Sequence, residues 1–268
     1  MKKAVIILAL VLTSTLTFAQ DAPLEVAPVP PSSAVKFAAA VDVVLPYLWR
    51  GIALNSTGKV AFQPYASLTI SDKFTFGVWG TTNLSNDAKE FNKSYNEFDW
   101  YASYQTCSIA KILVSDYYFD FAGARGKYFN YDNTSTQAID LSLLLNFASK
   151  GVPLDFQWNT LIAGNDFNNS GSRNYSSYAE MGYTQSIASA GIDLRAFAGA
   201  VVKSSIYYVT DGFKFTNVGL NAAKSIKFSE SFSLPVFLRY TYNDNGNFNT
   251  SGHLKRNFIS GGMTFTIK

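Results

Sequence analysis

The chain has 268 residues, of which 47% are apolar, 16% aromatic and 15% charged, and its formal net charge is +3. So small a charge provides no basic surface for a nucleic acid, and we expect no nucleic-acid partner. A single cysteine and a single histidine exclude a disulfide framework and a zinc site of ordinary ligand spacing. We therefore expect no metal, and no cofactor either, because a glycine-rich phosphate loop is lacking.

Residues 1–19 have the pattern of a secretory signal. Lys2 and Lys3 precede an apolar stretch, and Ala19 ends a small-x-small cleavage site. The apolar stretch is too short for a membrane-spanning helix, which needs about 20 residues. Residues 20–34 are rich in proline and predict an extended linker. The linker is either a simple periplasmic tail or a segment that tucks into the mouth of the following domain, residues 35–268.

From residue 35 onward, two kinds of break separate segments that have strand patterns. Short turns are expected at 71–73, 107–108, 148–151, 187–191 and 227–231. Longer loops, rich in Asn, Gly, Ser and Asp, are expected at 46–58, 84–94, 122–135, 164–174, 204–212 and 243–252. Short turns on one side and long loops on the other are typical of outer-membrane barrels. Five turns and six loops separate twelve strands. We predict an all-β fold, a twelve-stranded antiparallel up-and-down transmembrane β-barrel with both termini periplasmic.

Apolar and polar side chains alternate along most of these segments. For example, Phe98 and Trp100 alternate with Glu97 and Asp99. Because successive strand residues point to opposite faces, one set is predicted to contact lipid and the other the lumen. A soluble β-sandwich would also alternate, but its polar face would carry more charge, since soluble domains average roughly 25% charged residues.

Aromatic residues gather near the predicted strand ends, as they do in the two girdles of a membrane barrel. One girdle is expected to contain residues 117–121, Tyr207, Tyr208, Tyr240 and Tyr242. The alternation breaks near Ser115, where a β-bulge would restore it. Pro64 removes a hydrogen-bond donor from inside a predicted strand.

Outer-membrane hydrolases need a nucleophile and a histidine. The one histidine, His253, lies in the last long loop or at the start of the last strand, with Ser251 and Ser260 near it. The strand alternation does not bring these residues together as nucleophile, base and orienting group. We therefore predict that the protein is not an enzyme and has no catalytic residues.

Charged side chains are expected to line the lumen. The candidates are Glu97, Asp99, Asp140, Asp155, Glu180, Arg195, Lys203, Arg239 and Arg256, with acids mainly on middle strands and bases mainly on the last ones. In an open channel Arg239 and Arg256 would form a basic wall opposed by Glu97 and Asp99, and this segregation would set up a transverse field. Alternatively, local pairs such as Glu180 with Arg195, and Asp42 with Arg256, would plug the interior. Twelve strands lie between filled eight-stranded and open sixteen-stranded barrels, so both alternatives stay open.

A motif follows the first predicted strand. It reads Tyr47-Leu48-Trp49-Arg50-Gly51-Ile52, and Gln63-Pro64 and Phe76-Gly77-Val78-Trp79-Gly80 come after it. This segment resembles the TorF-like porin family, also known as the Gcw-chp group of conserved hypothetical outer-membrane proteins. That family carries an aromatic-x-aromatic-Arg-Gly motif after its first strand and a Gly-x-Trp strand soon after. The resemblance implies an outer-membrane barrel and a pore, and it supplies no catalytic residues.

Trp49, Arg50 and Gly51 are expected at the rim of the barrel. Gly51 permits a backbone turn that a Cβ atom would hinder. Arg50 either locks the first loop by pairing with a carboxylate or helps to select anionic solutes.

These patterns predict an outer-membrane protein of a Gram-negative bacterium that passes small hydrophilic solutes by passive diffusion. Its expected partners are membrane lipids, those solutes and, during biogenesis, the barrel-assembly machinery. The alternative is a non-transporting structural or surface-binding barrel whose long loops contact a partner.

Overall fold

The computed structural model describes residues 35–55, 58–84, 95–121, 127–248 and 254–267. The predicted signal, the proline-rich linker and His253 lie outside the described residues. Within the described ranges, no helix combines the length and the apolar character needed to cross a membrane.

The described chain forms a closed antiparallel barrel, and the predicted fold of twelve strands is confirmed. The barrel strands are β1 (Val35–Leu45), β4 (Ala61–Ile70), β5 (Phe74–Thr82), β6 (Tyr95–Cys107), β7 (Ala110–Phe121), β8 (Gln137–Asn146), β9 (Leu154–Gly164), β10 (Ser177–Ile187), β11 (Ile192–Val201), β12 (Lys214–Lys227), β13 (Ser233–Phe248) and β14 (Leu254–Ile267). Two short strands, β2 (Leu48–Trp49) and β3 (Ile52–Ala53), form a separate hairpin. A 3-10 turn, η1 (Ala148–Lys150), joins β8 to β9.

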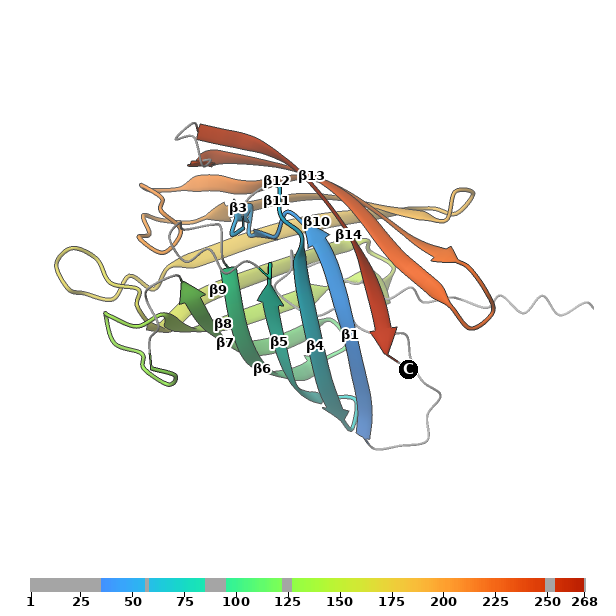
Figure 1. Ribbon diagram of the computed structural model, residues 1–268, viewed down its shortest axis with the longest axis horizontal. Coiled ribbons are helices and arrows are strands. Elements are labelled where there is room, and N and C mark those ends of the chain that lie inside the picture. Colours follow the sequence, from blue (N-terminus) through green and yellow to red (C-terminus); the bar gives the residue numbers. More distant parts are fainter. Residues whose placement is uncertain (1–34, 56–57, 85–94, 122–126, 249–253, 268) are drawn as a thin grey trace, which may run out of the picture.

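The first strand closes the barrel by pairing on both of its edges. Ala39 lies opposite Ala66 of β4 on one side and Ile267 of β14 on the other. Closure leaves no row of unpaired backbone groups along a sheet edge. The start of β1 and the end of β14 lie at the same end of the barrel, as an even number of strands requires (Figure 1).

Short turns and long loops occupy opposite ends of the barrel. At Ser71 and Asp72 the φ angles are 52° and 55°, and the amide of Lys73 donates to the carbonyl of Ile70. Positive φ at both central residues is the geometry that joins two twisted strands through two residues. The predicted turns are confirmed, but the last long loop begins later than predicted. β13 continues to Phe248 because its pairing with β14 resumes after an irregular step between Tyr242 and Asn247.

The predicted alternation of faces is also confirmed. On β6, Phe98 is 48% exposed and points outward, whereas Asp99 is 6% exposed and points inward. On β8, Leu143 is 41% exposed and Ser142 only 2%. The outer surface is therefore apolar along the strands, and the interior is mainly polar.

Two expectations about β7 and the aromatic girdle need revision. No bulge occurs at Ser115, since the pairing of β7 with β6 and β8 runs through that residue without a shift. Tyr117 and Phe119 are buried inside the barrel together with Tyr208, so they do not belong to an outer girdle. Their aromatic rings pack in the interior instead, because part of the first loop lies there. Pro64 lies inside β4, as expected, and is tolerated because the ladder between β4 and β5 skips this position.

Candidate functional site

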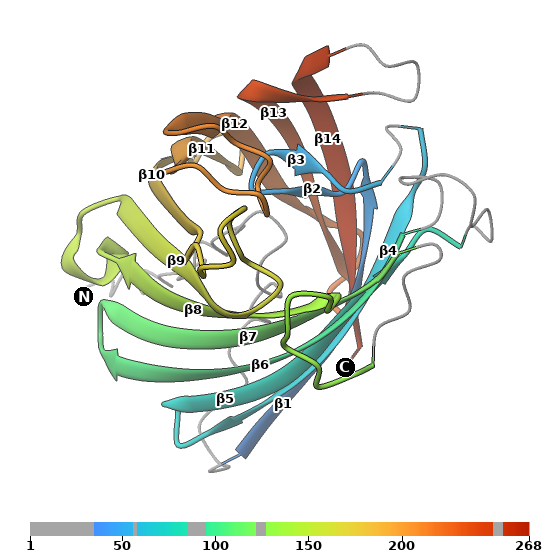
Figure 2. The same cartoon turned by 90° about the vertical axis from the view of Figure 1, so that its left-hand side faces the viewer.

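The β2–β3 hairpin lies inside the barrel, across the interior from β8 and β9 (Figure 2). Leu48 pairs with Ala53, and Trp49 pairs with Ile52. At the tip, Arg50 and Gly51 have φ angles of 46° and 81°, which match a two-residue turn with positive φ at both positions. The side chains of Leu48, Trp49 and Arg50 are at most 4% exposed. The predicted rim motif is therefore an internal element of the barrel.

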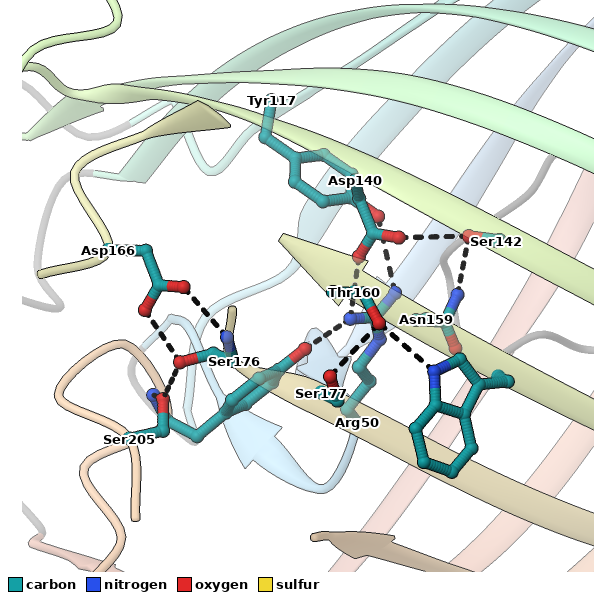
Figure 3. A network of polar contacts seen from close by, with 12 residues as sticks. Arg50, Tyr117, Asp140, Ser142, Asn159, Thr160, Asp166, Ser176, Ser177 and Ser205 are labelled. Carbon is teal, nitrogen blue, oxygen red and sulfur yellow. Dashed lines mark hydrogen bonds and ion pairs between the residues drawn. The ribbon is translucent and has the colours of Figure 1, made fainter. Parts of the chain in front are cut away.

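Arg50 forms an ion pair with Asp140 of β8 in the barrel interior. Its Nη1 atom lies 2.9 Å from Oδ2 of Asp140, and the two side chains are 1% and 0% exposed (Figure 3). Nη1 also donates a hydrogen bond to the hydroxyl of Tyr208, and Nη2 donates to the hydroxyl of Tyr117 at 3.4 Å. A buried guanidinium is tolerated only when such partners replace water. Arg50 therefore fastens the hairpin to the opposite wall.

Aromatic rings surround the guanidinium. Its central carbon lies 4.7 Å from the ring centre of Trp49 and 5.2 Å from that of Tyr178 on β10. Trp49 stacks on Tyr208 with ring centres 5.1 Å apart and an interplanar angle of 6°. It also meets Tyr117 edge-on at 6.0 Å. Cation–π attraction strengthens when water is excluded, so these rings add to the ion pair.

The backbone of the hairpin is fixed on its other side by β12, β13 and β14. Asn243 of β13 donates to the carbonyl of Gly51 at 3.0 Å, and Ser260 of β14 donates to that of Pro46 at 2.8 Å. A Cβ atom on Gly51 would lie 1.7 Å from the carbonyl oxygen of Thr216 on β12. Glycine is therefore required here both by its positive φ and by the close approach of the two backbones.

A second ionic cluster lies on the inner face of β9, β10 and β11. Arg195 donates to both carboxylate oxygens of Asp155, at 2.5 and 3.0 Å, and to Glu180 at 2.9 Å. The predicted contact between Glu180 and Arg195 is thus confirmed. Glu180 also accepts hydrogen bonds from the hydroxyl of Tyr178 and, at 2.6 Å, from the amide of Asn217. Each charge in this cluster has a local partner of opposite sign.

The remaining inward charges have separate surroundings. Glu97 accepts hydrogen bonds from Tyr47 of the first loop at 3.2 Å and from Tyr95 at 3.0 Å. Asp99 accepts from the backbone amide of Tyr118 at 3.2 Å. Burial, and then the charge of Glu97, raises the pKa of Tyr207 well above its usual range, so this tyrosine stays neutral at physiological pH.

Arg239 is buried on β13, where it donates to Asn217 at 2.8 Å and lies over the ring of Phe197 at 4.4 Å.

The expected pair of Asp42 and Arg256 is wrong. Asp42 lies opposite Thr264, whose hydroxyl donates to its carboxylate at 2.7 Å. Arg256 is exposed near the start of β14, and Lys203 is exposed in the loop after β11. Arg239 and Arg256 therefore form no continuous basic wall, because the alternation of β14 gives the face of Arg256 but not its height in the barrel.

Several residues of the site were missed by reasoning from the sequence. Tyr178, Tyr208 and Asn217 contact the buried charges, although none has a charge of its own to draw attention. The inward phase of Tyr117 and Tyr178 was the available signal, because an aromatic ring facing a barrel interior requires something to pack against.

A model for a bacterial protein of unknown function, Gcw_chp, matches residues 29–234. This range includes the complete hairpin, Asp140 and the Arg195 cluster, and it ends where β13 begins. No curated protein matches the chain.

The buried ion pair generates a prediction about stability. Asp140→Asn should lower the free energy of unfolding by about 3–5 kcal/mol, because it leaves the Arg50 guanidinium buried without its carboxylate. Arg50→Met should also be costly, and the double variant should cost less than the sum of the two, since it leaves neither charge alone. Reversible urea unfolding from lipid vesicles measures all three.

The matched control is the surface pair of Lys36 and Asp72, whose side chains are 33% and 73% exposed. Asp72→Asn should cost at most about 1 kcal/mol. Additive losses in the Arg50 and Asp140 variants would contradict the proposed coupling.

Proposed function

The chain belongs to the Gcw_chp family, and we propose that it is an outer-membrane barrel that passes small hydrophilic solutes by passive diffusion through an interior narrowed by the β2–β3 hairpin. The resemblance of its Trp49-Arg50-Gly51 segment to TorF-like porins agrees with this proposal. The proposal involves no catalytic step.

The outer surface supports the membrane placement. Large apolar side chains are exposed at outward positions of neighbouring strands, including Phe76, Phe98, Ile112, Leu141, Leu143, Trp158, Ile162, Leu194, Leu220 and Leu238. A continuous apolar surface of this kind is unfavourable in water and favourable against hydrocarbon. We therefore propose that the outer faces of the strands contact lipid.

One observation about the interior carries the proposal of a solute pathway. The inward wall is lined mainly by polar side chains, among them Gln63, Gln157, Asn159, Thr216 and Asn221. A polar group that faces a dry interior without a partner costs about 1–3 kcal/mol. Water in a lumen beside this polar wall would avoid that cost. A hydrated interior is the requirement for diffusion of hydrophilic solutes, and a purely structural barrel has no need of it.

The hairpin determines how much of that interior is free. Since Arg50 is bound to Asp140, the proposal gives it the role of a lock for the first loop, not that of a selector of anions. A pathway past the locked hairpin is narrow, and release of the hairpin would widen it.

The second candidate is a non-transporting barrel whose loops contact a partner. It is favoured by the burial of Arg50 and Asp140 at 0% exposure, because so complete a burial of an ion pair is also suited to a permanent plug.

Single-channel recording in planar bilayers tests the proposal. The parent protein should give small, discrete conductance steps. Arg50→Ala and Gly51→Ala should give larger steps, because the first removes the lock and the second forces the hairpin away from Thr216. Phe129→Ala, a change at a 69% exposed loop residue, is the control and should leave conductance unchanged.

Absence of conductance in the parent protein and in both hairpin variants would reject the channel and favour the non-transporting barrel. If all four proteins gave the same conductance, the protein would still be a channel, but the hairpin would not control its conductance.

The membrane placement has its own test. Leu141→Arg places a charge in the middle of the outward face of β8 and should cost about 2–4 kcal/mol in reversible unfolding from lipid vesicles. Ala188→Arg, in the exposed turn between β10 and β11, should change the free energy of unfolding little. Equal losses at the two positions would show that the outward face of β8 does not contact hydrocarbon.

A further inference from the structure

Asp116 has a carboxylate that lies on the outward face of the barrel wall and yet is buried. It shares its phase along β7 with the outward residues Ile112 and Tyr118, but it is 0% exposed. The hydroxyl of Tyr131 and the side-chain amide of Gln137 both donate to this carboxylate. Gln137 is the first residue of β8, and Tyr131 belongs to the loop between β7 and β8. This loop therefore folds back over the outer wall and covers a charge there.

Aromatic contacts hold the same loop against the wall. The ring centre of Tyr128 lies 4.8 Å from that of Tyr118 and 6.3 Å from that of Phe98. Phe98 and Tyr118 lie opposite each other on the outward face of β6 and β7. Tyr128 also meets Phe129 edge-on at 4.7 Å. We call residues 127–136 the outer flap, because these aromatic rings join it to the apolar outer wall.

The position of Asp116 along β7 gives the height of the outer flap. Asp116 is the seventh residue of β7, counted from the short turn at its start. At about 3.4 Å per residue it lies roughly 20 Å along the strand from that turn. A strand tilt of about 40° reduces this to a height of roughly 15 Å, whereas the apolar band of a membrane barrel is about 25 Å tall. Since Tyr131 contacts Asp116, part of the flap lies at the height of a band that begins near the short turns.

Phe129 is held at the surface of the outer flap by an unfavourable backbone conformation. Its φ angle is 64°, which a bulky side chain seldom adopts, and its amide donates to the side-chain oxygen of Gln137. The ring is nevertheless 69% exposed. Glycine or asparagine would adopt this conformation more readily, so the turn itself does not require a phenylalanine. Strain that is retained with an exposed apolar ring indicates that the ring contacts something outside the chain.

We propose that the outer flap binds lipid, and that the ring of Phe129 inserts among the acyl chains beside β6, β7 and β8. An exposed aromatic ring gains free energy when it leaves water for an apolar medium. Tyr128 and Tyr131 suit the adjoining boundary with the lipid headgroups, because each tyrosine has an apolar ring and a polar hydroxyl. Lipid is the occupant because the flap continues the apolar wall that we propose to contact lipid. The inference rests on that membrane placement and not on the solute pathway.

Nitroxide labels test this contact in the full-length mature protein, reconstituted into phosphatidylcholine vesicles. In a Cys107→Ser background, Phe129→Cys carries the label. Its collision rate with oxygen, which dissolves in hydrocarbon, is compared with its collision rate with the charged chromium oxalate complex, which stays in water. The matched control is Val209→Cys. Val209 also has a positive φ, 54°, and is 74% exposed, but its loop packs into the barrel interior through Tyr207 and Tyr208.

The ratio of the oxygen rate to the chromium rate should be at least about fivefold higher at position 129 than at position 209, because a charged complex is excluded from hydrocarbon. Asn133→Cys places the label on the exposed polar part of the same flap and should give a ratio like that of position 209. Leu143→Cys, on the outward face of β8, reports on the membrane placement alone and should give a high ratio. The heat-dependent shift in electrophoretic mobility of folded barrels establishes that each labelled variant is folded.

The outcomes separate the outer flap from the membrane placement. A low ratio at position 129 together with a high ratio at position 143 would overturn the lipid contact of the flap and leave the membrane placement intact. Low ratios at both positions would reject both. If neither reagent reached the label at position 129, protein would cover the ring, and the lipid contact would also be overturned. Conductance tests the channel separately, because the flap lies on the outer wall.

Discussion

The interior of this barrel depends on the ion pair between Arg50 and Asp140. Removing a guanidinium or a carboxylate from water costs several kcal/mol of hydration free energy for each group. The two groups therefore stay buried only if they contact one another in good geometry. The 2.9 Å contact, the hydroxyls of Tyr117 and Tyr208 and the ring of Trp49 supply that geometry. Because Arg50 belongs to a loop and Asp140 to the wall, satisfying the charge also positions the loop.

The rest of the interior accommodates the hairpin that carries Arg50. Gly51 lets the hairpin approach the backbone of β12, and the aromatic rings of β7 and β10 turn inward to surround it. Polar side chains cover the remaining wall, and some of their atoms have no protein partner in the described ranges. The outer wall follows the opposite rule, with apolar side chains at the alternate positions. A polar interior inside an apolar cylinder follows from the combination.

The strand count, turns and faces could be predicted because each depends on local patterns: turn residues, loop length and the period of two along a strand. The contact of Glu180 with Arg195 could be predicted for the same reason, since the two residues share a hairpin. The position of the Arg50 hairpin could not be predicted, because the residues that it contacts lie on strands far away in the sequence. For that reason Tyr117 was assigned to an outer girdle. Arg256 was assigned to a wall that it does not reach because the period of two gives the face of a residue but not its height in the barrel.

Accessibility of the hairpin tests the central claim most directly. In a Cys107→Ser background, Leu48→Cys places a thiol at a position that is 0% exposed in the barrel interior. A membrane-impermeant thiol reagent should label this position slowly when Asp140 is present. Labelling should be at least about tenfold faster after Asp140→Asn, because the hairpin leaves the interior when its carboxylate partner is lost. Fast labelling at the same rate in both proteins would contradict the account.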